Sequence, residues 1–144
     1  MIIRKATKRD IVEIVKLMLE EFKKPPFNER ASLKYVLKSL NFYFKIGTIY
    51  IATYKKEIIS VLVFKIEQWW EGPVIIIEDL AVKGEFKKRK IDRIIMNKLE
   101  YYAKKNKIKK IIFDTNIKSP SIRLFKRFGY KHRKDIISME KRIR

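Results

Sequence analysis

Apolar residues in the first third of the chain recur at the three- and four-residue spacing of amphipathic helices. A short strand at Ile2–Lys5 precedes a helix whose start is predicted by Thr7 and Asp10, which have the spacing of a capping box. The apolar face of this helix comprises Ile11, Ile14, Val15, Met18, Leu19 and Phe22. Pro25-Pro26 ends the helix, and a loop expected to contact a substrate leads to a second one. The second apolar face comprises Leu33, Val36, Leu37, Leu40 and Phe44.

The middle of the chain changes to a composition typical of β-strands. Residues 48–54 and 57–66 are rich in Ile, Val, Tyr, Phe and Thr, and a tight turn near Lys55-Lys56 would join them as a hairpin. A second turn over residues 69–73 leads into a third strand, residues 74–82. We therefore expect an antiparallel meander.

The last third alternates between helix and strand. An apolar helical face at Ile91, Ile94, Ile95, Leu99, Tyr102 and Ala103 precedes a strand predicted over residues 109–115. Because a strand, a helix and a strand in succession form a parallel pair, the sheet should be mixed. Ser119 and Pro120 predict the start of another helix that stops at Gly129, and residues 135–141 predict a last strand. The expected fold is one α/β (α+β) domain, residues 1–144, with six to seven strands and about four helices.

Composition narrows the possible functions. Apolar residues make up 47% and charged ones 36%, which excludes a disordered chain and a membrane protein, and the start shows no signal peptide, so we expect a cytoplasmic protein. With no Cys and one His, a thiol nucleophile and a metal cluster are excluded. The net charge of +20 favours a polyanionic partner such as nucleic acid. Alternatively, the charge reflects the composition of a thermophilic host.

A run of cations lies between a predicted strand and a predicted helix. Helix N-termini bind phosphates because their first N–H groups have no partner within the helix and carry a partial positive charge. The cationic turn, Lys87-Lys88-Arg89-Lys90, therefore predicts a phosphate site, although such a run elsewhere indicates a solvated turn or a nucleic-acid patch. Asp92 in the first turn of the helix is equally well explained as a helix cap.

Two adjacent carboxylates, Glu78 and Asp79, end the third strand of the meander. Because side chains alternate along a strand, they should project to opposite faces. We expect Glu78 to be a catalytic base or an anchor for an amine, and Asp79 to be structural. The alternative is that both carboxylates only solvate the strand end or pair with nearby lysines. A polycationic substrate would need an acidic pocket, for which Glu78, Asp79 and the pair Glu20-Glu21 are the candidates.

Four segments in this order resemble the GNAT superfamily of N-acetyltransferases: I-R-K-A-T-K-R-D, the strand I-E-D-L-A-V, the basic turn into a helix, and P-S-I-R-L-F-K-R-F-G-Y. Within the superfamily, E-D-L-A-V followed later by P-S-I-R-L-F-K-R-F-G is most similar to the polyamine and small-amine acetyltransferase branch. The resemblance implies that acetyl-CoA lies against Leu80, Ala81 and Val82, with its pyrophosphate on residues 87–93. The implied cofactor contacts in full are Leu80, Ala81, Val82, Lys87, Lys88, Arg89, Lys90, Ile91, Asp92, Arg93, Asn116, Lys118 and Ser121.

The sequence departs from the family pattern in three respects, at four positions. The two turn glycines align with Lys90 and Asp92, the tyrosine that commonly protonates the thiolate aligns with Phe125, and an asparagine aligns with Lys118. The resemblance implies direct acetyl transfer from acetyl-CoA to a primary amine of a small molecule or a protein, by a monomer or homodimer. The alternative is a GNAT-fold protein that has lost catalysis and binds nucleic acid or another polyanion through its basic surface.

Overall fold

The computed structural model describes residues 1–143, apart from the side chain of Lys88. The chain divides into two compact units, Met1–Asp114 and Thr115–Arg144, and each is described by itself. The first unit contains the sheet and most of the helices, and the second contains one short helix.

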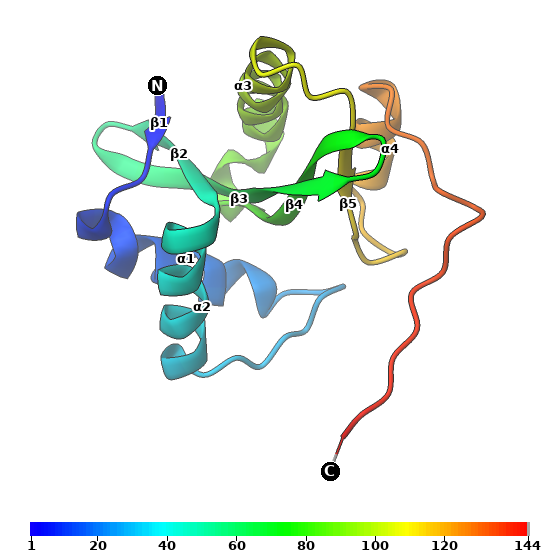
Figure 1. Ribbon diagram of the computed structural model, residues 1–144. Helices are drawn as coiled ribbons and strands as arrows, with labels where there is room; N and C mark the ends of the chain where they lie inside the picture. Colours follow the sequence, from blue (N-terminus) through cyan, green and yellow to red (C-terminus); the bar gives the residue numbers. More distant parts are fainter. Residues whose placement is uncertain (144) are drawn as a thin grey trace. The chain divides into compact units, whose positions relative to one another are not determined.

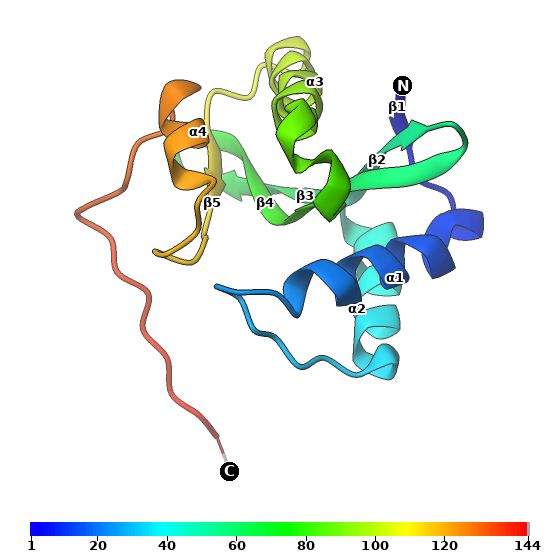
Figure 2. The same cartoon turned by 180° about the vertical axis from the view of Figure 1, so that it is seen from behind.

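In the first unit, helices cover both faces of a five-stranded sheet (Figure 1). Its strands are β1 (Ile2–Lys5), β2 (Thr48–Tyr54), β3 (Glu57–Trp69), β4 (Gly72–Val82) and β5 (Ile111–Phe113). Its α-helices are α1 (Ile11–Phe22), α2 (Leu33–Ile46) and α3 (Ile91–Lys105), and the 3-10 helices are η1 (Lys8–Asp10) and η2 (Gly84–Arg89). Seen from both sides, α1 and α2 lie on one face of the sheet and α3 on the other (Figures 1 and 2).

The sheet is mixed, as predicted. Its strands follow one another in the order of the sequence, the first four antiparallel, while β5 pairs parallel to β4 at Ile75–Ile77 after the crossover through α3. The predicted strand count of six to seven was too high. The described residues of the second unit contain no strand at residues 135–141, where every side chain is exposed. An isolated strand gains no ladder hydrogen bonds, so an apolar pattern alone does not make one.

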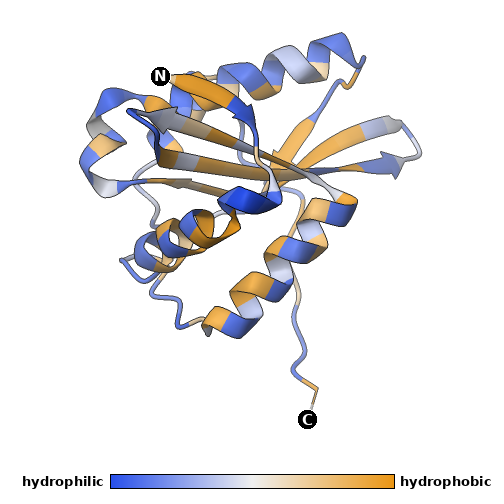
Figure 3. Cartoon of the chain, turned by 90° about the vertical axis from the view of Figure 1, so that its left-hand side faces the viewer, coloured by the Kyte–Doolittle hydropathy of each residue, from blue (hydrophilic) through white to orange (hydrophobic). Residues whose placement is uncertain are grey.

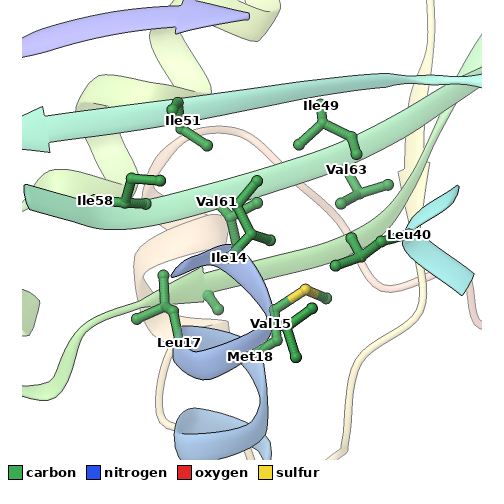
Figure 4. Packing of buried hydrophobic residues seen from close by; sticks show 11 residues of the cluster. Ile14, Val15, Leu17, Met18, Leu40, Ile49, Ile51, Ile58, Val61 and Val63 are labelled. Atoms are coloured by element: carbon green, nitrogen blue, oxygen red, sulfur yellow. The ribbon is translucent and has the colours of Figure 1, made fainter. Parts of the chain in front are cut away.

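The core under α1 and α2 confirms the predicted face of α1 and that of α2 except at Leu33, which is 56% exposed at the start of the helix. Side chains from α1, α2, β2 and β3 interlock there (Figure 4), and Ile14, Leu40 and Ile51 are at most 1% exposed. Along the helices hydrophobic positions alternate with hydrophilic ones, while the strands are mostly hydrophobic (Figure 3). Burial of this kind is worth about 1.5–3 kcal/mol for each large aliphatic side chain, which fixes the α1–α2 layer on the sheet.

The first helix begins as the capping box predicts. Asp10 Oδ2 accepts a hydrogen bond from the backbone N–H of Thr7 at 2.8 Å, and η1 forms the first turn before α1. Arg4 donates two hydrogen bonds of 2.9 Å to the same carboxylate, which links β1 to the start of the helix.

The second unit contains α4 (Ile122–Arg127). Ser121, not Ser119, is its N-cap, because residues 119–121 form a separate turn in which the two serine hydroxyls lie 2.8 Å apart. Gly129 ends the helix as predicted. Its φ is +93°, and the N–H of Tyr130 donates to the carbonyl of Phe125 at 3.0 Å, the pattern of a Schellman motif.

Candidate active site

A β-bulge interrupts β4 at the two carboxylates that the sequence marks. Asp79 pairs with Val63 and Ile77 pairs with Phe64, so Glu78 is an extra residue without a counterpart on β3. As a result, both carboxylates face the α1–α2 layer: Glu78 contacts Tyr43 of α2, and Asp79 lines a cavity together with Tyr43. The expectation that they project to opposite faces was wrong, because a bulge breaks the two-residue period of a strand.

Glu78 is held by two side chains. Lys65 Nζ lies 2.9 Å from Glu78 Oε1, and the Tyr43 hydroxyl donates a hydrogen bond of 3.3 Å to Glu78 Oε2. The hydrogen bond to Glu78 raises the pKa of Lys65, and burial, with the charges of Glu78 and Asp79, raises the pKa of Tyr43. Lys65 therefore stays charged and Tyr43 stays neutral, and both orient Glu78. This is the lysine pairing that we named as the alternative to a catalytic role.

A cavity of about 180 Å³ lies between α1, the loop after it, α2 and the bulge of β4. Its lining residues are Met18, Leu19, Phe22, Glu29, Ala31, Tyr35, Val36, Ser39, Leu40, Tyr43 and Asp79. Glu29 and Asp79 are its two ionisable acids, while most of the remaining wall is aliphatic or aromatic. Glu29, Tyr35 and Ser39 are exposed, so the cavity opens to solvent along the loop and α2. Such a cavity suits a small ligand with an apolar body and a positive charge.

Asp79 has a pKa near neutrality. Burial raises its pKa, and the negative charges of Glu29 and Glu78 raise it further, to about 7 from an ordinary value of 3.8. A base is most effective when its pKa lies near the working pH, since it is then both deprotonated and able to hold a proton. The sequence pointed to Glu78 as a base or an amine anchor and to Asp79 as structural; in the structure Glu78 is paired with Lys65, and Asp79 is the carboxylate whose pKa lies near neutrality.

Beyond the bulge, β4 has an open edge. β5 pairs with β4 only at Ile75–Ile77, whereas β4 continues to Val82, still paired on its other side with β3. Within the described residues no strand pairs with this edge at Leu80, Ala81 and Val82. Backbone N–H and C=O groups at such an edge can bind an extended ligand.

The cationic turn leads directly into α3. Lys90, aligned with a family glycine, has φ +56° and ψ +34°, a left-handed conformation that glycine adopts without strain. Asp92, aligned with the other glycine, accepts a hydrogen bond of 2.9 Å at Oδ1 from the N–H of Arg93. Its carboxylate thus lies on the helix start as a cap does, and burial raises its pKa. Ile91 is buried at 4% exposed and anchors the first turn in the core.

Two of the four predicted phosphate-binding cations already have partners. Lys87 Nζ lies 2.8 Å from Oε1 of the buried Glu21, and the Arg89 guanidinium stacks over the rings of Phe86 and Tyr54. Lys90 is exposed, and the side chain of Lys88 lies outside the described part of the chain. Glu21, which the sequence offered as part of an acidic substrate pocket, instead serves as a counter-charge for the turn.

The remaining predicted site residues, Asn116, Lys118, Ser121 and Phe125, belong to the second unit. Within that unit, Asn116 Oδ1 accepts a hydrogen bond of 2.8 Å from the N–H of Lys118. The ring of Phe125 contacts the ring of Tyr130 with centroids 5.7 Å apart, so a phenol hydroxyl belongs to the same aromatic cluster. Sequence reasoning did not find Glu29 or Tyr43, because neither belongs to a motif and only the tertiary fold brings them to Asp79.

Two further observations concern metal ligands and membrane-spanning helices. The described residues contain no group of three or more His, Cys, Asp and Glu side chains that could hold a metal ion. None of the helices in this part of the chain is long and apolar enough to cross a bilayer.

A comparison with protein families decides the class of the protein. The model of the Acetyltransferase (GNAT) family matches residues 12–130, most of the chain. The chain belongs to the GNAT family. This confirms the resemblance and, with it, the expected fold class and the expected enzyme class, an N-acetyltransferase.

Solved structures agree on the fold of this GNAT protein. A possible acetyltransferase from Clostridium difficile is 13% identical, with a TM-score of 0.87 over 99% of this chain and 98% of that one. An aminoglycoside antibiotic 6'-N-acetyltransferase from Acinetobacter haemolyticus is 15% identical, with a TM-score of 0.81 and full coverage of both chains. A transcriptional regulator from Bacillus halodurans is 18% identical, with a TM-score of 0.78 over 97% and 99% of the two chains. The search of curated proteins found no match.

Proposed function

We propose that this GNAT protein transfers an acetyl group from acetyl-CoA to a primary amine bound in the cavity beside Asp79. The observation that carries the proposal is the pairing of a carboxyl whose pKa is raised to about 7 with a cavity of about 180 Å³ beside the open edge of β4. A base, an acceptor site and a strand edge able to take an extended ligand thus meet at one bulge.

The cavity favours a small acceptor that carries positive charge. Although the chain has a net charge of +20, Glu29, Glu78 and Asp79 make the region around the cavity locally acidic. The aromatic rings of Phe22, Tyr35 and Tyr43 offer contact to the apolar part of an alkyl or aryl amine. The cavity therefore suits a small-molecule amine, including a short polyamine, better than an acceptor that is attracted to the protein by its net positive charge.

The proposed reaction needs a base for the amine, a proton source for the leaving thiolate, and side chains that keep the base in its environment. Asp79 takes a proton from the bound ammonium, so that the nitrogen lone pair can attack the thioester carbonyl carbon. As the C–N bond forms, the nitrogen loses its second proton to water, the C–S bond breaks, and that water supplies the proton to the leaving thiolate, since Phe125 at the usual tyrosine position has no proton to give. Tyr43 and Lys65 hold Glu78 in place, and Glu78 keeps the pKa of Asp79 high.

On the donor side, acetyl-CoA supplies the activated acetyl group. Its pantetheine arm would lie along the open edge of β4 at Leu80, Ala81 and Val82, and its pyrophosphate at the start of α3. A lysine about 4 Å from a phosphate oxygen contributes on the order of 4 kcal/mol at an effective dielectric near 20, before desolvation. A contact of this size from Lys90 would therefore help to offset the loss of the two glycines and the competing carboxylate of Asp92.

The proposal is tested by titrating the protein with CoA while following its melting temperature, then measuring thiol release from acetyl-CoA with a panel of primary amines. We expect CoA to raise the melting temperature, since only the native state binds it, and thiol release to depend on the amine. A tertiary amine of similar size serves as the control, because its nitrogen, once acylated, has no proton left to lose and cannot form a stable amide. Absence of CoA binding at near-millimolar concentration would refute the proposal.

A further inference from the structure

A buried carboxylate outside the active site joins α1 to the turn before α3. Glu21 is only 5% exposed, although it lies in the last turn of α1. Its Oε2 accepts hydrogen bonds from Lys24 Nζ at 2.8 Å and from the backbone N–H of Gly84 at 3.1 Å. Its Oε1 forms the ion pair with Lys87 at 2.8 Å. The first residue of η2, Gly84, and its fourth, Lys87, are therefore tied to one carboxylate.

The electrostatics show that Glu21 is charged in the folded protein. Burial raises its pKa, but the hydrogen bonds and charges of Lys24 and Lys87 outweigh burial, so the pKa lies below its ordinary value. A buried charge is tolerated only when it is paired and hydrogen-bonded. Displacing one of the partners of Glu21 would leave this charge uncompensated, which costs free energy.

Gly84 is the residue of the turn whose backbone donates to this carboxylate, but the contact does not require glycine. A side-chain carbon at position 84 would lie 2.9 Å from Lys24 Nζ, the end of a flexible side chain that can move aside, and 3.7 Å from Glu21 Oε2, an ordinary contact. The link therefore rests on the hydrogen bond and the ion pair of Glu21.

The contact between Glu21 and η2 connects the two parts of the proposed site, the amine cavity and the pyrophosphate site. On α1, Met18, Leu19 and Phe22 line the cavity beside Asp79. From η2, the chain passes through Lys90 straight into the first turn of α3. Anything that fixes η2 on α1 therefore also fixes the start of α3 relative to the cavity.

We propose that Glu21 is a positioning residue that holds η2 and the start of α3 ready to receive the pyrophosphate of CoA. The inference rests on the proposed function, since it assigns a role within the same donor site. Glu21 itself would not touch the cosubstrate. It would act through Gly84 and Lys87, so its loss should weaken binding of the pyrophosphate and leave binding of the pantetheine arm unchanged.

The test compares two ligands, CoA and pantetheine, which differ in the pyrophosphate and nucleotide part. We expect Glu21→Gln to raise the dissociation constant of CoA about tenfold or more, as for the loss of hydrogen bonds to a charged group, and to leave that of pantetheine within about twofold. Glu20→Gln is the matched control, because it makes the same change at the adjacent, exposed position and should alter neither constant.

Two results would overturn the inference: CoA binding by Glu21→Gln that equals the wild type, or an equal loss for CoA and pantetheine, which would indicate general damage. If Glu21→Gln does not fold, Glu21→Asp is the second variant, since it retains the charge but moves the carboxylate away from Gly84 and Lys87. It should weaken the binding of CoA but not that of pantetheine, and CoA binding equal to that of the wild type would count against the inference. Failure of the wild-type protein to bind CoA would instead refute the proposed function.

Discussion

Replacing Asp79 by asparagine should make the protein more stable at alkaline pH and much less active. Asp79 has a pKa of about 7 in the folded protein against an ordinary value of 3.8. Between these two values the folded state keeps a proton that the unfolded state releases, so the free energy of unfolding falls as pH rises through this window. Above pH 7 the whole cost is present, and below about pH 4 it vanishes.

The magnitude follows from the two pKa values. At about 1.4 kcal/mol for each tenfold change in proton affinity, the cost has an upper bound on the order of 4 kcal/mol. Because Asp79 is only partly buried, solvent screening should reduce the gain in Asp79→Asn to about 1–3 kcal/mol at pH 8, with little gain at pH 4. The loss of the base should lower kcat/KM by about a hundred- to ten-thousand-fold.

Urea unfolding of the wild type and Asp79→Asn at pH 4, 6 and 8 measures the stability difference, and amine-dependent thiol release measures activity. The matched control is Glu78→Gln, which neutralises the adjacent carboxylate, already paired with Lys65. It should lower the pKa of Asp79 and retain most of the activity. A stability difference between the wild type and Asp79→Asn that stays constant from pH 4 to pH 8 would refute the reasoning.

Three further predictions concern other parts of the chain. Glu29→Gln should shift the acidic limb of the pH profile of kcat/KM to lower pH, since the charge of Glu29 helps to raise the pKa of Asp79. It should also raise KM more for a diamine than for a monoamine. An unchanged pH profile would argue against this role of Glu29. Lys55→Asn combined with Lys56→Gly should raise the free energy of unfolding in urea by about 1 kcal/mol, because both lysines have positive φ, of 50° and 65°, in the β2–β3 turn; a decrease would contradict this. Glu21→Gln should make the free energy of unfolding less sensitive to acid. The lowered pKa of Glu21 stabilises the folded protein at pH values above the ordinary pKa of 4.5, and this stabilisation is lost as the pH falls. If the free energies of unfolding in urea of the wild type and the variant fall in parallel from pH 6 to pH 3, that role is excluded.

Features set by local spacing could be predicted from the sequence. The capping box at Thr7 and Asp10, the apolar face of α1, and the stop at Gly129 each depend on residues within a few positions of one another, and the structure contains all three. The parallel pair of β4 and β5 was predictable too, because a helix between two strands imposes it.

Features set by tertiary contact could not be predicted. The bulge at Glu78 depends on how β3 pairs with β4, and it brings both carboxylates to the face of the sheet that carries α1 and α2. Glu21 resembles any surface residue of an amphipathic helix until Lys87, 66 positions later, meets it at 2.8 Å. Residues 135–141 show that an apolar run is insufficient for a strand when no neighbouring strand is at hand in its own unit.

The central claim is that Asp79 deprotonates a primary amine for attack on acetyl-CoA. Its most direct test is the pH dependence of kcat/KM for the wild type with acetyl-CoA and a small primary amine whose product is verified as the acetamide. The account predicts that the acidic limb rises through a pKa of about 7 and is absent from the residual activity of Asp79→Asn. Formation of the acetamide with the same limb in both proteins would contradict it.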